Sequence, residues 1–106
     1  MGDAPDKPNP KGFINLSKRL LGDKLCIENI PIAYVGDTIA DIKTVVNARK
    51  VIPSQKFISI GIAPPHLHLK SRLKERNAYE KNLKNAGADL ILNCINDLEN
   101  INLDLL

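Results

Sequence analysis

Short apolar runs alternate with segments of helical periodicity along this chain. Apolar residues gather at 32–35, 57–60 and 89–92, as in strands that are buried rather than half exposed. Between these runs, apolar positions recur three or four residues apart over about 39–46 and 70–86, which predicts helices. Strands that alternate with helices pair in parallel through right-handed crossovers. The sequence therefore predicts an α/β fold, a partial three-layer Rossmann-like parallel sheet of about three strands with flanking helices.

A further helix is expected before the first strand. Asn9 is a good N-cap residue, and Pro10 suits the first helical position because its missing N–H would have no partner there. Gly22 can end this helix in a left-handed conformation. Four apolar residues at helical spacing predict its apolar face: Phe13, Leu16, Leu20 and Leu21.

Length and composition limit the chain to one domain. It has 106 residues, of which 43% are hydrophobic and 25% charged, enough for a single core and too few for two ordinary domains. We expect one domain over 1–106, with a loop over 1–9 and a helix and β/α units over 10–106. The sequence shows no apolar run long enough to cross a bilayer and no basic, apolar leader, so we expect a cytoplasmic protein that does not bind membranes.

The two cysteines support the same compartment. Cys26 and Cys94 lie far apart in the sequence without a Cys-x-x-Cys spacing. This pattern is typical of reduced thiols in the cytoplasm and not of a disulfide framework or a zinc site. We expect both side chains to be small buried apolar groups.

Basic residues are concentrated in the segment 70–84. It holds six Lys or Arg residues and two Glu residues, whereas the whole chain has 15 basic and 12 acidic residues. A basic helix can bind nucleic acid, but the chain has only two Tyr and two Phe residues for base stacking. A nucleic-acid-binding module is therefore the less favoured hypothesis, and a solvated helix face is preferred.

The stretch 36–41, Gly-Asp-Thr-Ile-Ala-Asp, carries the chemistry. Asp37 follows an apolar strand and so lies at the carboxyl edge of the sheet, where open α/β sheets bind ligands. Asp41 falls in the first turn of the next helix, and two carboxylates in one crevice would suit a hard cation such as Mg²⁺. Thr38 and Asp41 also form a capping box. Metal binding and capping both remain open, but capping leaves Asp37 unexplained, because an unpaired carboxylate there is costly.

Lys7 and the loop over 61–68 are further candidates. Lys7 lies in a stiff, proline-flanked loop where it could hold a positive charge near a ligand, although a lone loop lysine is usually a solvated surface group. The loop over 61–68, with the sequence GIAPPHLH, is predicted to be non-helical because it contains two prolines. It leaves the same sheet edge as Asp37, so its His66 and His68 could meet a substrate, the alternative being a solvated loop.

The order of these motifs resembles a known family. Lys-Pro-Asn-Pro at 7–10, then a helix, a connector, and an apolar strand that ends in Gly-Asp-Thr-x-x-Asp are similar to the third and fourth motifs of the haloacid dehalogenase-like (HAD) superfamily. The stretch 85–92 also resembles the carboxyl-terminal strand of that family's core. Most members are magnesium-dependent phosphohydrolases, so the resemblance implies Mg²⁺ as cofactor and phosphate monoesters as substrates.

The resemblance also implies a role for each motif residue. Lys7 would steady the phosphoryl group and the nucleophile. Asp37 would be a magnesium ligand, and Asp41 a second acidic group that binds or orients the metal or its water. Gly36 and Thr38 would shape the turn.

The chain departs from the family in one important respect. Family members form an aspartyl-phosphate on an Asp-x-Asp motif after the first strand, and this sequence has no Asp-x-Asp. It therefore resembles the carboxyl-terminal half of such an enzyme, without a cap domain, and we expect it to be inactive alone. The alternative is a non-catalytic α/β interaction domain that retains the fold and the metal site.

The missing first half also predicts a partner. In the family's sheet the strand matching 32–35 lies beside the first strand, which this chain lacks. An apolar strand would then become an edge, so we expect self-association or a partner that supplies the missing strands. The expected ligand of the parent enzyme is a phosphorylated small molecule.

Overall fold

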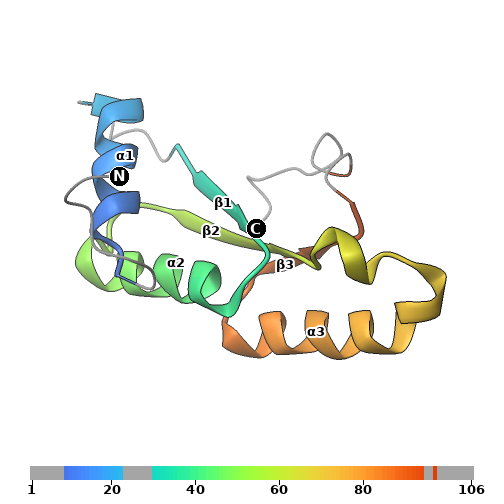
Figure 1. The fold of residues 1–106 in the computed structure, drawn as a ribbon. Helices are drawn as coiled ribbons and strands as arrows, with labels where there is room; N and C mark the ends of the chain where they lie inside the picture. The colour runs from blue at the N-terminus through green and yellow to red at the C-terminus, as the bar shows by residue number, and fades with distance from the viewer. Residues whose placement is uncertain (1–8, 23–29, 95–96, 98–106) are drawn as a thin grey trace.

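The computed structural model describes residues 9–22, 30–94 and 97 of the chain. Helices and strands alternate in the order that the sequence predicts (Figure 1). The α-helices are α1 (Lys11–Leu21), α2 (Ile39–Val51) and α3 (Leu73–Ala86), the strands are β1 (Ile32–Gly36), β2 (Phe57–Ile62) and β3 (Leu90–Leu92), and two short 3₁₀ helices are η2 (Pro65–Leu67) and η3 (Lys70–Arg72).

The strands form one open parallel sheet in the order β1-β2-β3. Gly36 at the end of β1 lies opposite Gly61 in β2, and Ile62 at the end of β2 lies opposite Leu92 at the end of β3. All three carboxyl ends therefore meet at one edge of the sheet. This arrangement confirms the predicted partial Rossmann-like α/β fold.

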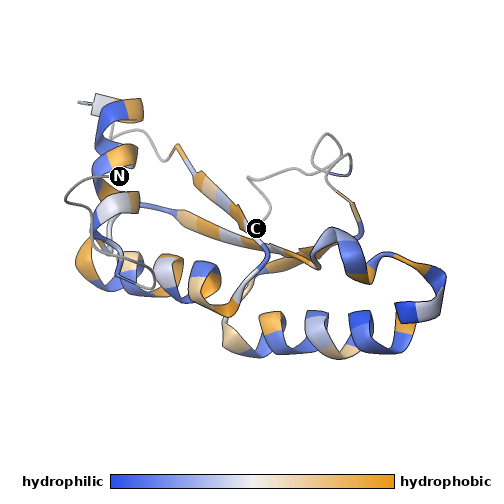
Figure 2. Ribbon diagram, viewed as in Figure 1, coloured by the Kyte–Doolittle hydropathy of each residue, from blue (hydrophilic) through white to orange (hydrophobic). Residues whose placement is uncertain are grey.

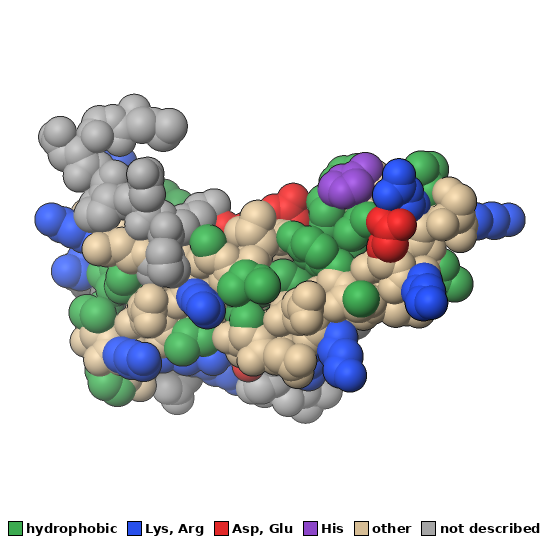
Figure 3. Space-filling model, turned by 60° about the horizontal axis from the view of Figure 1, so that its bottom comes forward, with side chains coloured by type: hydrophobic (Ala, Val, Ile, Leu, Met, Phe, Trp, Pro, Cys, Tyr) green, Lys and Arg blue, Asp and Glu red, His purple; other side chains and the backbone are tan. Residues whose placement is uncertain are grey.

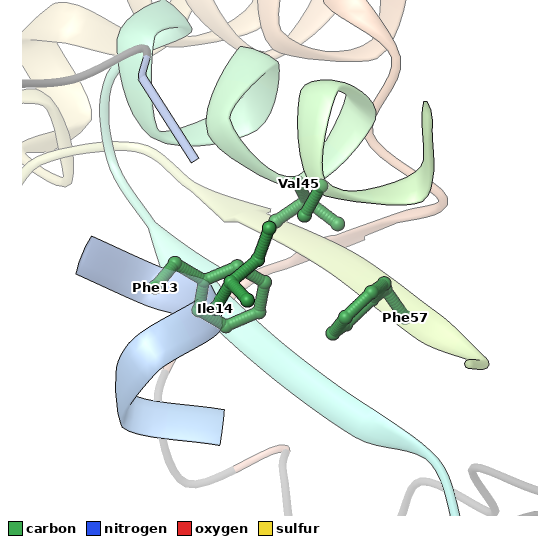
Figure 4. Close-up of a cluster of buried hydrophobic side chains, with 5 residues drawn as sticks. Phe13, Ile14, Val45 and Phe57 are labelled. Atoms are coloured by element: carbon green, nitrogen blue, oxygen red, sulfur yellow. The ribbon is translucent and has the colours of Figure 1, made fainter. Parts of the chain in front are cut away.

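One face of the sheet packs against α1 and α2. Phe13 and Ile14 from α1, Val45 from α2 and Phe57 from β2 share a buried cluster (Figure 4). The ring of Phe13 lies edge-on to that of Tyr34, with centroids 5.0 Å apart. Aromatic pairs favour this geometry, so the cluster fixes α1 on the face of β1 that also carries α2.

Helix α3 covers the same face further along the sheet. Ile42 from α2 and Leu83 from α3, both fully buried, pack with Ile91 of β3. The opposite face of the sheet carries a separate apolar cluster around Ile58 and Ile60. The described residues thus form two of the three expected layers, the sheet and one layer of helices. The strands are the most consistently hydrophobic elements (Figure 2).

The first helix differs from its sequence prediction in which side it buries. Leu16 and Leu20 are 53% and 71% exposed, so they do not form the buried face. Phe13 is buried as predicted, and Ile14 and Ser17 are buried in place of the leucines, because α1 meets α2 and β1 along a narrow stripe at its first two turns. The expectation for the apolar face was therefore wrong in part, while the helix itself is confirmed.

Helix α1 ends at Gly22 as predicted, but it begins one residue later than predicted, with Pro10 and not Asn9 at the N-cap position. The side chain of Asn9 accepts a hydrogen bond from the backbone N–H of Lys11 at 2.9 Å, although Pro10 lies just before the helix. Gly22 ends the helix with φ of +54° and donates its N–H to the carbonyl of Lys18, as a residue without a Cβ can do at no steric cost.

Three further expectations need correction. Strand β1 is half-buried along 32–35 instead of fully buried, because β2 is its one neighbouring strand among the described residues. The segment 61–68 contains regular secondary structure that was not predicted. Strand β2 continues to Ile62, and Pro65 begins a 3₁₀ helix, because the first position of a helix tolerates proline. Cys94 is exposed, not buried, because it follows the end of β3 at the edge of the sheet, and Cys26 lies outside the described residues.

No described helix has the length and apolar character needed to cross a membrane.

Candidate functional site

The connection from β1 to α2 is built around a capping box. Thr38 has extended backbone angles, and its hydroxyl oxygen accepts a hydrogen bond from the N–H of Asp41 at 3.1 Å. In return, the Asp41 carboxylate accepts one from the N–H of Thr38 at 3.2 Å. Two donors of the first helical turn are thus satisfied reciprocally, as the sequence predicts.

Asp41 does more than cap the helix. Its Oδ2 also accepts a hydrogen bond from the N–H of Asp37 at 3.2 Å, and its Oδ1 accepts one from the Tyr34 hydroxyl at 3.0 Å. The residue is only 4% exposed. A carboxylate held by several donors in this way can stay ionised while buried, so Asp41 fixes the end of β1 against the start of α2.

Gly36 is required by this close packing. A Cβ added at residue 36 would lie 2.3 Å from the Cβ of Asp41, far inside the closest distance that two carbon atoms tolerate. The chain can therefore turn over the buried carboxylate only where residue 36 has no side chain.

The turn leaves Asp37 in a different environment. No described residue donates a hydrogen bond to its carboxylate, whereas its backbone carbonyl accepts one from the hydroxyl of Tyr79 on α3. Burial raises the pKa of Tyr79 above its usual value, and the nearby charges of Asp37 and Asp41 act in the same direction. Tyr79 therefore remains a neutral donor at neutral pH and ties the loop after β1 to α3.

A cavity of about 390 Å³ lies at the carboxyl ends of the three strands. Each strand contributes to its lining: Asp37 follows β1, Ile62 ends β2, and Cys94 follows β3, with the loop after β2 supplying Ala63, Pro64, Pro65 and His68. This volume is within the range of small-molecule sites, and its position is the one at which open α/β sheets bind ligands.

Of the two histidines, the structure brings His68 to this cavity. Its Nε2 lies 2.7 Å from the carbonyl oxygen of Ala63. Because a carbonyl can only accept, Nε2 must carry a proton there. His66 is exposed and does not line the cavity. Of the two histidines expected to meet a ligand, His68 therefore lies at the site and His66 does not.

The described residues do not form a complete metal centre. They contain no group of three or more His, Cys, Asp or Glu side chains that could hold a metal ion. Mg²⁺ is commonly bound through one or two carboxylates with water and substrate phosphate as the other ligands. Asp37 fits the part of such a carboxylate, whereas both oxygens of Asp41 are already occupied as hydrogen-bond acceptors.

Lys7, the remaining predicted site residue, lies outside the described residues.

The basic segment 70–84 contains local ion pairs. Arg72 pairs with Glu75, and Arg76 pairs with Glu80 and also donates to the carbonyl of Asn93. On the face shown in Figure 3 the Lys and Arg side chains are scattered among other residue types. Most residues of 70–84 are exposed, as in a solvated face, whereas the side chains of Arg76 and Glu80 are only 18% and 19% exposed.

Sequence reasoning missed three contributors to the site. Tyr34 and Tyr79 hold the turn through their hydroxyl groups, and Cys94 lines the cavity. Tyr34 could have been found from the sequence, because it is a side chain with a polar end within an apolar strand. Tyr79 lies 42 residues beyond Asp37, so local sequence patterns cannot identify it.

No family model, curated protein or solved structure matches this chain.

Proposed function

We propose that this chain is the carboxyl-terminal portion of a HAD-like, magnesium-dependent phosphohydrolase core that acts on phosphate monoesters. The observation that carries the proposal is the position of Asp37. It follows β1 at the carboxyl edge of the sheet, lines a cavity of ligand size, and has a carboxylate that no described residue uses.

In this proposal one residue of the turn binds the cation, and its neighbours position that residue. Asp37 would bind the cation, while Asp41 positions it by accepting a hydrogen bond from its N–H at 3.2 Å. Tyr79 holds the carbonyl of Asp37 from the other side. Gly36 and Thr38 shape the turn that carries Asp37.

Mg²⁺ at this position would supply charge neutralisation to the oxygens of a phosphoryl group. By the family resemblance, Lys7 would add a second positive charge to the same group. The sequence lacks the Asp-x-Asp nucleophile, so the proposal for this chain alone is binding of metal and phosphate, without turnover.

The test is calorimetric titration of the full chain with inorganic phosphate, with and without Mg²⁺. We expect Mg²⁺ to strengthen phosphate binding, and Asp37→Asn to remove that enhancement. Glu75→Gln is the matched control, because it removes an exposed carboxylate of α3 instead. Phosphate binding that is insensitive to Mg²⁺, or equal enhancement in the Asp37→Asn variant, would contradict the proposal.

A non-catalytic interaction domain is the second candidate. It is favoured by the position of β1, which has β2 as its one described strand neighbour and carries apolar Ala33 and Val35 on the face without described α-helices. Such a domain would bind its partner equally well with Asp37 replaced by Asn, so partner binding by this variant tests the second candidate.

A further inference from the structure

The wall of the cavity beside Asp37 consists mainly of carbon. It is formed by the end of β2 and the loop that follows, through Ile62, Ala63, Pro64 and Pro65. None of these side chains can donate or accept a hydrogen bond. A ligand that occupies the cavity must therefore place apolar atoms against this wall.

The backbone of the same loop offers few free polar groups. Pro64 and Pro65 have no N–H. The carbonyl of Ala63 already faces the Nε2 of His68 at 2.7 Å. The carbonyls of Pro64 and Pro65 accept hydrogen bonds from the N–H groups of residues 67 and 68 at 3.0 and 3.1 Å.

This pattern discriminates between classes of ligand. The hydroxyl groups of a sugar or polyol would be desolvated against the loop without gaining partners, and an unsatisfied polar group is costly to bury. A flat or alicyclic hydrocarbon group loses nothing there and gains by leaving water. Among the described residues, three ionisable groups line the cavity: Asp37, His68 and Cys94. Asp37 follows β1 and Cys94 follows β3, while His68 lies three residues after the second proline.

We propose that the cavity binds the apolar, ring-containing alcohol portion of a phosphate monoester, with the loop over 62–65 as its specificity-determining wall. The assignment of the phosphate end to Asp37 rests on the proposed function, whereas the preference for an apolar ring rests on the cavity alone. The site therefore selects aryl or alicyclic phosphates over sugar or polyol phosphates.

The experiment follows backbone amide shifts of the full chain by NMR during titration with two monoesters, phenyl phosphate and glycerol 3-phosphate, in the presence of Mg²⁺. We expect phenyl phosphate to bind about tenfold more tightly, the scale on which apolar pockets discriminate. Its shifts should include the amides of Ile62, Ala63 and His68. Equal affinity for the two esters would overturn the proposal.

Two serine variants locate the preference in the wall. Pro65→Ser replaces an exposed lining residue at the start of a 3₁₀ turn, and should reduce the ratio of the two affinities. Leu69→Ser is the matched control, because Leu69 is 59% exposed in the same connection between β2 and α3 but does not line the cavity. An unchanged ratio in Pro65→Ser, in a variant whose spectrum shows the native fold, would also overturn the proposal.

A third probe separates this inference from the proposed function. Benzyl alcohol has no phosphate, and it should shift the amides of Ile62 and Ala63 without Mg²⁺ in both the native chain and the Asp37→Asn variant. Failure of Mg²⁺ to strengthen phosphate binding would defeat the proposed function, while shifts with benzyl alcohol would still support the apolar site. The absence of those shifts would overturn the apolar site by itself.

Discussion

At the scale of single residues, two aspartates four positions apart have acquired different environments. Asp41 is buried and accepts hydrogen bonds from two backbone N–H groups and a tyrosine hydroxyl. Asp37 lines a cavity, and no described residue donates to its carboxylate. The buried carboxylate is stable because its partners replace water, and the other is available to a ligand.

This difference predicts effects of different size for the same isosteric change at Asp41 and Asp37. Asp41→Asn should lower the free energy of unfolding by about 1–2 kcal/mol, because an amide cannot match a carboxylate that accepts from three donors. Asp37→Asn should change it by less than about 0.5 kcal/mol, as expected for a side chain without such contacts. Urea denaturation followed by circular dichroism measures both. A larger loss in Asp37→Asn than in Asp41→Asn would contradict this division of roles.

The sequence predicts part of this site and leaves part undecided. Thr38 and Asp41 have the spacing of a capping box, so the box could be predicted, but Asp41 also fitted a metal site together with Asp37. The structure adds Tyr34, seven residues before Asp41, whose hydroxyl donates to the second carboxylate oxygen. Such a contact depends on the twist and register of β1 and cannot be deduced from local spacing.

At the scale of elements, the junction between β1 and α2 determines the position of Asp37. Gly36→Ala should destabilise the chain by about 1–3 kcal/mol, the usual cost of overpacking, because the new Cβ would lie 2.3 Å from the Cβ of Asp41. Gly61→Ala is the control in the neighbouring strand. Its Cβ would first meet the Cδ1 of Ile91 at 3.0 Å, a flexible group that can shift, so the loss should be smaller. Thermal unfolding compares the two variants, and equal losses would contradict the close packing at residue 36.

Element positions were predictable, and so was the burial of β2, but the exposure of β1 and α1 was not. Apolar runs and glycine or proline boundaries located each helix and strand to within a few residues. The half-buried state of β1 and the exposed Leu16 and Leu20 of α1 depend on which surfaces the neighbouring elements cover. That information lies in the tertiary arrangement and not in the spacing of apolar residues.

At the scale of the whole molecule, the described helices occupy one face of the sheet, and β1 has one described strand neighbour. Both features are expected of one half of a doubly wound fold, in which consecutive right-handed crossovers in one direction place their helices on the same face. The other half of such a fold would add strands beside β1 and helices over the cluster around Ile58 and Ile60.

Among the described residues β1 is an apolar strand with one strand neighbour, and such a strand predicts association. Sedimentation velocity at several protein concentrations should show self-association of the purified chain. Ala33→Lys, which places a charge on β1, should reduce it, whereas Asn85→Lys adds the same charge on an exposed position of α3 and should leave it unchanged. A stable monomer at all concentrations, with the amides of 32–35 protected from hydrogen exchange, would contradict this prediction.

The central claim is that Asp37 offers a carboxylate to a divalent cation at the carboxyl edge of the sheet. Its most direct test is titration of the full chain with Mg²⁺ alone, followed through backbone amide shifts. We predict weak binding that first shifts the amides of 36–38, is lost in Asp37→Asn and is retained in Glu75→Gln. Equal shifts scattered over the acidic residues of the surface, or the same response in Asp37→Asn, would contradict the account.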